Sequence, residues 1–166
     1  RRDFLKLSGL FISMHQLLPK SLWAKETSVV AVAEGQDYGA IARSAVNALG
    51  GMTRFVKAGD IVAVKPNMGW DRRPEQAATT HPAVVRAIVE ECLKAGAKRV
   101  KVFDNPCNDL RRSYENSGIP AALKDLKNVD VRYMEEERYK NVNLKGIFLK
   151  EWELYSDALK ADVFIN

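Results

Sequence analysis

The sequence predicts an α/β fold with a mostly parallel sheet, helices on both faces and a Rossmann-like layering. Short apolar runs rich in β-branched residues, such as 61–65 and 99–104, alternate with amphipathic segments such as 38–49 and 82–95. Strands covered on both faces are apolar almost throughout, and strands that alternate with helices form parallel sheets through right-handed crossovers. A chain of 166 residues is also long enough to bury a core of its own without disulfides or metals.

The elements follow one another without a repeat or a flexible linker. We expect strands at 28–33, 61–65, 99–104, 129–133 and 162–166, and helices at 38–49, 82–95 and 119–126. Gly50-Gly51 and Gly96 end the first two helices, and Pro66 ends the second strand because proline has no N–H for the ladder. The apolar run at 162–166 predicts a buried strand, after which more chain normally follows. The sheet therefore either ends there or, as we expect, is incomplete at its C-terminal side.

The first 24 residues resemble a twin-arginine (Tat) export signal. The paired arginines of Arg1-Arg2-Asp3-Phe4-Leu5-Lys6 precede a moderately apolar run, and Ala24 offers a small residue for cleavage. The resemblance implies export to the periplasm or another extracytoplasmic space, with residues 25–166 as a single α/β domain. The alternative is an amphipathic N-terminal helix of that domain, since apolar residues of this run also recur at near-helical spacing.

Charge and composition exclude several classes of protein. The formal net charge is +5, of which the first 24 residues carry +3, so the remaining chain is only weakly basic. It contains no block of lysine and arginine with interleaved aromatics, which argues against nucleic-acid binding. No apolar run approaches the roughly 20 residues of a membrane span. Cys92 and Cys107 stand too far apart for a zinc or thioredoxin-like motif.

The familiar catalytic fingerprints are also absent from the sequence. No G-x-G-x-x-G follows the first predicted strand, and no P-loop, G-x-S-x-G elbow or H-E-x-x-H helix occurs anywhere. The sequence therefore assigns no catalytic residue, and the candidate binding residues are those that follow the predicted strands.

One candidate binding site follows the strand 61–65. Ligands of open α/β sheets bind beyond the carboxyl ends of the strands, where helix N-termini also offer backbone donors. Pro82 suits the first turn of a helix that Thr80 or His81 would cap. These donors, with nearby polar side chains, predict a site for a small anionic ligand such as a phosphate or carboxylate; its candidate residues are Lys65, Asn67, Thr79, Thr80 and His81. In the alternative interpretation Thr80 only caps the helix and Lys65 is solvated.

A second candidate loop follows the strand 99–104. Asp104 and Asn105 are placed to meet a ligand hydroxyl, and Asp104 and His81 are weak candidates for metal ligands. Cys107 lies in the same loop, and the simpler interpretation is that its thiol is inert. A histidine at a helix start with no second histidine nearby is also more often structural than catalytic.

Several of these motifs together resemble the bacterial and archaeal family called domain of unknown function 362. The likeness covers about residues 28–166. It is carried by Val64-Lys65-Pro66-Asn67, by Thr79-Thr80-His81-Pro82, by Lys94-Ala95-Gly96-Ala97-Lys98, by the strand ending in Asp104 and by Asp162-Val163-Phe164-Ile165-Asn166. The resemblance implies frequent export, an association with ferredoxin-like iron–sulfur modules, and a family pattern that continues beyond the last of these motifs.

Two hypotheses follow for function. In the first, the chain is an exported redox or cofactor-associated enzyme, or half of one, that binds an anionic ligand at the strand ends. An iron–sulfur cluster usually needs four thiolates, so with two cysteines it would have to lie on a ferredoxin-like partner or on a further region of the protein. In the second, the chain is a non-catalytic periplasmic domain that binds a ligand or a partner.

Overall fold

The computed structural model describes residues 29–166, so the predicted Tat signal at 1–24 lies outside the described residues. Residues 31–166 form one compact unit. At its centre is a four-stranded sheet in the order β3-β2-β1-β6, with every neighbouring pair parallel. Its strands are β1 (Ile61–Val64), β2 (Arg99–Val102), β3 (Val129–Val131) and β6 (Val163–Ile165). The predicted parallel α/β fold is thus confirmed.

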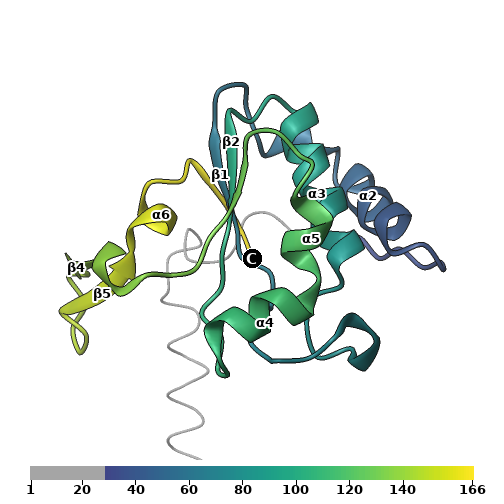
Figure 1. Cartoon of the computed structure of the whole chain (residues 1–166). Helices are drawn as coiled ribbons and strands as arrows, with labels where there is room; N and C mark the ends of the chain where they lie inside the picture. The colour runs from purple at the N-terminus through teal and green to yellow at the C-terminus, as the bar shows by residue number, and fades with distance from the viewer. Residues whose placement is uncertain (1–28) are drawn as a thin grey trace, which may run out of the picture. The chain divides into compact units, whose positions relative to one another are not determined.

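Helices cover the two faces of this sheet unequally (Figure 1). One face carries α2 (Tyr38–Ala48), α3 (Pro82–Lys94), α4 (Leu110–Ser117) and α5 (Ile119–Leu123). The other face carries the four-residue helix α6 (Ser156–Leu159) beside an antiparallel hairpin of β4 (Tyr139–Asn143) and β5 (Glu151–Tyr155). Short 3-10 turns occur at Met52–Arg54, Pro74–Gln76 and Glu136–Arg138.

The alternation of side chains along β1 and β2 builds two cores. Val62, Val64, Val100 and Val102 are buried in the larger core, which includes apolar side chains of α3 and α5. Ala63, between Val62 and Val64, belongs to a smaller core with Phe103 and Tyr155 on the opposite face. Both faces of the central strands are therefore buried, as their continuous apolar runs predict.

Local sequence fixes where the main helices begin and end. Asp37 caps α2 by accepting a hydrogen bond from Ala40 N at 2.7 Å. Gly96 follows α3 with φ +99°, and a Cβ there would lie 3.0 Å from Ala58 Cα, so this turn requires glycine. Gly118, with φ +70°, joins α4 directly to α5.

The structure corrects one expectation about the fold, the strand at 28–33, and adds a helix and a hairpin that the sequence did not predict. Residues 29–33 form no strand, and Val30 and Val32 are largely exposed, because this apolar run has no ladder partner in the described chain. Helix α4 and the hairpin β4–β5 were not expected from the sequence. The strands of the hairpin are mostly polar, so their hydrophobic pattern is weak.

No helix within residues 29–166 has the length and apolar character needed to cross a bilayer.

An ion pair joins α3 to the turn after α5 and gives a direct prediction. Arg86 donates to both carboxylate oxygens of Asp125, at 2.7 and 2.9 Å, and to the carbonyl of Ala122. These hydrogen bonds lower the pKa of Asp125 to about 2. In Arg86→Gln we expect the pKa of Asp125 to rise toward about 4, the ordinary value for aspartate, because the largest cause of its lowering is removed. Carbon-detected NMR titration measures it directly. Arg111→Gln is the control, and an unchanged Asp125 midpoint in Arg86→Gln would contradict the assignment.

Candidate functional site

The two candidate loops meet at an ion pair between Lys65 and Asp104. Lys65 follows β1 and its backbone N–H donates to Ile165 O of β6 at 2.8 Å. Its ammonium Nζ lies 2.7 Å from Asp104 Oδ1, just beyond β2. The carboxylate is buried, with 5% of its side chain exposed, whereas 40% of the Lys65 side chain is exposed. Parallel neighbouring strands thus bring residues 39 positions apart in sequence to one edge of the sheet.

Backbone and side-chain donors hold Asp104 firmly in this position. Its Oδ2 accepts from Met68 N at 2.6 Å, and Met68 is fully buried. The Asp104 N–H donates to the hydroxyl oxygen of Tyr114 at 2.8 Å, and this hydroxyl in turn lies 2.8 Å from the carbonyl oxygens of Asp104 and Arg132. Burial raises the pKa of Tyr114 well above its ordinary value, so the hydroxyl keeps its proton.

Asn67 and Thr80 close the long loop between β1 and α3. The Asn67 N–H donates to Thr80 Oγ1 and the Thr80 N–H donates to Asn67 O, each at 2.9 Å. The Asn67 side chain also accepts from Gly69 N and donates to Ala78 O. Both residues therefore brace the loop that borders the strand ends. The Thr79 hydroxyl is buried and has no partner among the described residues.

His81 is the N-cap of α3, one of the two caps expected. Its Nδ1 accepts from Ala83 N at 3.2 Å, and its ring stacks on Tyr38 with centroids 4.1 Å apart. The N–H groups of Val84 and Val85 donate to His81 O, and Pro82 has none. The expectation of free backbone donors in this turn is therefore wrong, because His81 itself accepts their hydrogen bonds. An anion there would depend on side chains instead.

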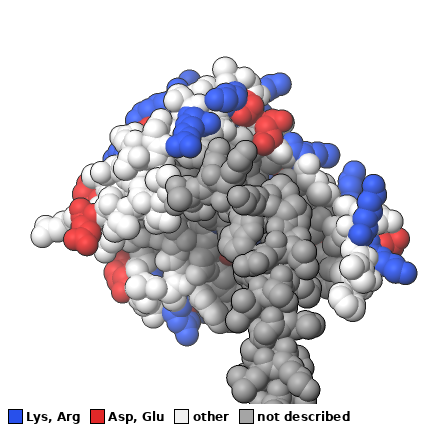
Figure 2. Space-filling model, turned by 180° about the vertical axis from the view of Figure 1, so that it is seen from behind, with Lys and Arg blue, Asp and Glu red and all other residues white. Residues whose placement is uncertain are grey.

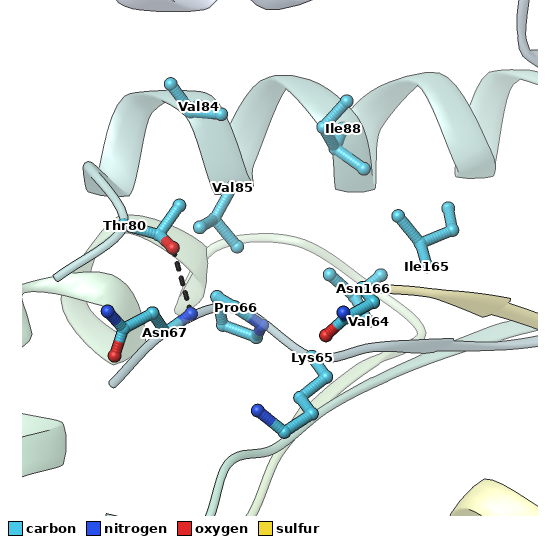
Figure 3. A pocket seen from close by; sticks show the side chains of 10 residues that line it. All are labelled: Val64, Lys65, Pro66, Asn67, Thr80, Val84, Val85, Ile88, Ile165 and Asn166. Carbon is cyan, nitrogen blue, oxygen red and sulfur yellow. Dashed lines mark hydrogen bonds between the residues drawn. The ribbon is translucent and has the colours of Figure 1, made fainter. Parts of the chain in front are cut away.

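A cavity of about 410 Å³ lies between α3 and the carboxyl ends of β1 and β6 (Figure 3). Its walls are mainly apolar, and three of the predicted site residues line it. Figure 3 shows Thr80 directed at Asn67, and the Lys65 side chain extending from the strand end away from α3. The lining residues are Val64, Lys65, Pro66, Asn67, Thr80, Val84, Val85, Ile88, Ile165 and Asn166. An apolar cavity with a few polar groups is the usual form of a small-molecule site.

Asn105 lies apart from this cavity. It is exposed and lines a separate open hollow of about 770 Å³ with Tyr139, Glu135 and Glu153. Successive residues of an extended chain point in opposite directions, which separates Asn105 from Asp104. The two weak metal candidates, His81 and Asp104, are engaged by the helix cap and by Lys65. No group of three His, Cys, Asp or Glu side chains suited to a metal occurs in the part of the chain that the structure describes.

Two buried polar side chains of the described chain were not predicted from the sequence. One is Tyr114, which lies on the unexpected helix α4. The other is the buried carboxylate of Asp157, which accepts from Lys101 at 2.6 Å and from Arg138 at 2.8 Å on the opposite face of the sheet. Burial raises the pKa of Asp157, but the two cations outweigh it and the net pKa is lowered. Lys101 interrupts an otherwise apolar strand, and this lysine is the sequence feature that could have indicated a buried acidic partner.

The two cysteines differ sharply in their surroundings. Cys92 is fully buried on α3, and burial raises the pKa of its thiol to about 12, whereas Cys107 is exposed. Because the thiolate is the reactive form, we expect a disulfide reagent to modify Cys107 and leave Cys92 unmodified in the native chain. Mass spectrometry of the labelled chain counts the adducts. Two adducts before denaturation would contradict the buried placement of Cys92.

The fold defines an α/β protein whose candidate site lies at the carboxyl end of a parallel sheet. Residues 62–166 match the family described as Domain of unknown function (DUF362), and the chain belongs to that family. It is 34% identical over 125 residues to the thylakoid-associated protein sll1697 of Synechocystis sp. (strain ATCC 27184 / PCC 6803 / Kazusa). The aligned part is 75% of this chain but 37% of that relative, so the chain corresponds to well under half of it. No solved structure shows a significant match.

Proposed function

We propose that this chain is the ligand-binding part of a longer protein, and that its ligand is a small organic acid with an apolar body. The apolar body would occupy the cavity beside α3, and its acidic group would accept from Lys65. The observation that carries the proposal is that Lys65 lines a cavity whose walls are mainly apolar, while its ammonium, on a side chain that is 40% exposed, pairs with Asp104 at the same edge of the sheet.

The electrostatics of Lys65 support an acidic rather than a neutral ligand group. An ammonium has three N–H donors. The Lys65 ammonium forms an ion pair with Asp104, and it has no further ion-pair partner among the described residues. Asp104 is in turn held by Met68 N, so it keeps Lys65 at the strand end. A carboxylate that reaches Lys65 would form a charge-assisted hydrogen bond without displacing Asp104.

Titration calorimetry with octanoate and 1-octanol tests the proposal, because the two probes share an apolar chain and differ in the acidic group. We expect octanoate to bind about tenfold more tightly than 1-octanol, as a hydrogen bond to a charged group would provide. Lys65→Gln, which can still donate to Asp104, should remove that preference, and Lys94→Gln should leave it intact.

Val84→Phe provides the complementary variant, since Val84 lines the cavity and a larger side chain fills it. We expect it to weaken both probes together. Failure of both probes to saturate, or equal affinities in the wild type, Lys65→Gln and Val84→Phe, would refute the proposal.

We also propose that the longer protein is exported and takes part in redox or cofactor-dependent chemistry, with any iron–sulfur cluster on a ferredoxin-like partner or on a further region. The twin arginines at Arg1-Arg2 support export, and the name of the Synechocystis relative supports association with a membrane-bounded compartment. Replacing both arginines by lysine should keep the longer protein in the cytoplasm. Unchanged periplasmic recovery would contradict Tat export, and iron analysis of the purified longer protein with and without its partner tests the redox role.

A further inference from the structure

The tip of the β4–β5 hairpin exposes large apolar side chains. This hairpin tip consists of residues 144–150, between the two strands. Phe148 is 99% exposed and Ile147 88%, and Leu144 and Leu149 are also exposed. Phe148 is the most exposed of the large apolar side chains in the described part of the chain. Contiguous exposed apolar groups of this kind mark contact surfaces.

The backbone of the hairpin tip holds these side chains outward. Leu144 N donates to Lys150 O at 2.7 Å, which closes the loop, and Lys145 N donates to Asn143 Oδ1 at 2.9 Å. A Cβ on Gly146 would lie 2.5 Å from Leu149 O, so this tight turn requires glycine. The exposure of Ile147 and Phe148 is therefore a property of a defined turn.

Charge is distributed unevenly along the hairpin. Lys145 and Lys150 flank the apolar residues, and residues 144–150 contain no acidic side chain. Glu151 and Glu153 lie on β5, beyond the tip. Figure 2, turned by 180° from Figure 1, shows Lys and Arg side chains at its right-hand edge, the side of the hairpin, with acidic side chains beside them. The hairpin tip itself thus combines exposed apolar side chains with two lysines and no acidic group.

We propose that the hairpin tip inserts into an anionic lipid surface. Ile147 and Phe148 would enter the boundary between headgroups and acyl chains, and Lys145 and Lys150 would contact lipid phosphates. A stable protein interface buries about 800 Å² on each partner, which a narrow turn with a few apolar side chains does not offer. A lipid surface has no such requirement, and its negative charge complements the two lysines.

An environment-sensitive fluorophore at the tip tests this directly. NBD is attached through Ile147→Cys in a Cys107→Ser background of the full 166-residue chain, and the buried Cys92 stays unlabelled. With vesicles of equimolar phosphatidylcholine and phosphatidylglycerol we expect a blue shift and a gain in emission. The same label at Phe55→Cys, directly after the 3-10 turn Met52–Arg54, should not respond. The label reports on its own site, so vesicle binding through residues 1–28 alone would leave its emission unchanged. Emission at Ile147→Cys that does not change with these vesicles would overturn the proposal.

Vesicle flotation of variants of the hairpin tip measures lipid binding independently of the fluorophore. Relative to the wild type, Ile147→Ser with Phe148→Ser should weaken tip insertion more than tenfold, given the apolar area of the two side chains. Each of Lys145→Gln and Lys150→Gln should weaken it about fivefold on anionic vesicles. Phe55→Ser, which changes another exposed phenylalanine outside the hairpin, should have no effect. Light scattering tests whether the chain self-associates. If it does, if the double Ile147→Ser, Phe148→Ser variant abolishes self-association, and if the fluorophore does not respond to vesicles, the tip is instead a contact between copies of the chain.

Discussion

Asp157→Ala is expected to destabilise the fold by about 3 kcal/mol, because it leaves two cations without their shared carboxylate. Asp157 is 3% exposed, and Lys101 and Arg138 both converge on it from other elements. The two cations remain partly accessible to water, which places the effect at the lower end for a broken buried pair. Urea denaturation measures it, and Asp162→Ala, which removes an aspartate hydrogen-bonded to Ile61 N nearer the surface, provides a comparison.

The same ion cluster predicts how stability depends on pH. The net pKa of Asp157 is lower in the folded chain than in the unfolded chain, where aspartate titrates near pH ~4. The carboxylate therefore contributes its full stabilisation above that value, and this contribution is lost as the pH falls through the lower, folded pKa. The stability difference between the wild type and Asp157→Asn should shrink progressively below about pH 4. A difference that stays constant from neutral pH into this range would contradict the ion-pair account.

Asp104→Ala is expected to cost about 2 kcal/mol, since it leaves the buried Met68 N–H without an acceptor. Lys65 loses its partner as well, but 40% of its side chain is exposed and water can replace the carboxylate. Asp104→Asn should cost clearly less, because its amide oxygen can still accept from Met68 N. Thermal denaturation of the two variants compares them, and equal losses would show that charge rather than this hydrogen bond holds the loop.

Much of the fold could be predicted from local patterns. The apolar runs at β1 and β2 and the amphipathic faces of α2 and α3 lie within a residue or two of the expected bounds, because their periodicity and their Pro and Gly boundaries agree. The hairpin could not be predicted in this way. Its strands are mostly polar, and its most exposed apolar side chains, Ile147 and Phe148, lie in the turn between them. The run at 29–33 has the composition of a strand, but a strand also needs a neighbour to pair with.

The candidate site could be predicted where it depends on strand ends alone. Lys65 and Asp104 follow neighbouring parallel strands, so topology brings them together. The roles of Asn67 and His81 could not be derived from sequence, since a polar side chain beside a helix start can face a ligand or satisfy the backbone. Here the backbone engages both. Tyr114 belongs to a helix without a clear apolar stripe, so its contact with Asp104 depends on tertiary packing.

The most direct test of the proposed binding site is a ¹H–¹⁵N NMR titration of the chain with octanoate. The account predicts saturable shifts centred on the cavity, at Lys65, Asn67, Thr80 and Ile165, with a much smaller response in Lys65→Gln. Saturable shifts centred instead on the hollow lined by Tyr139 and Glu153, or no saturable shifts at all, would contradict it.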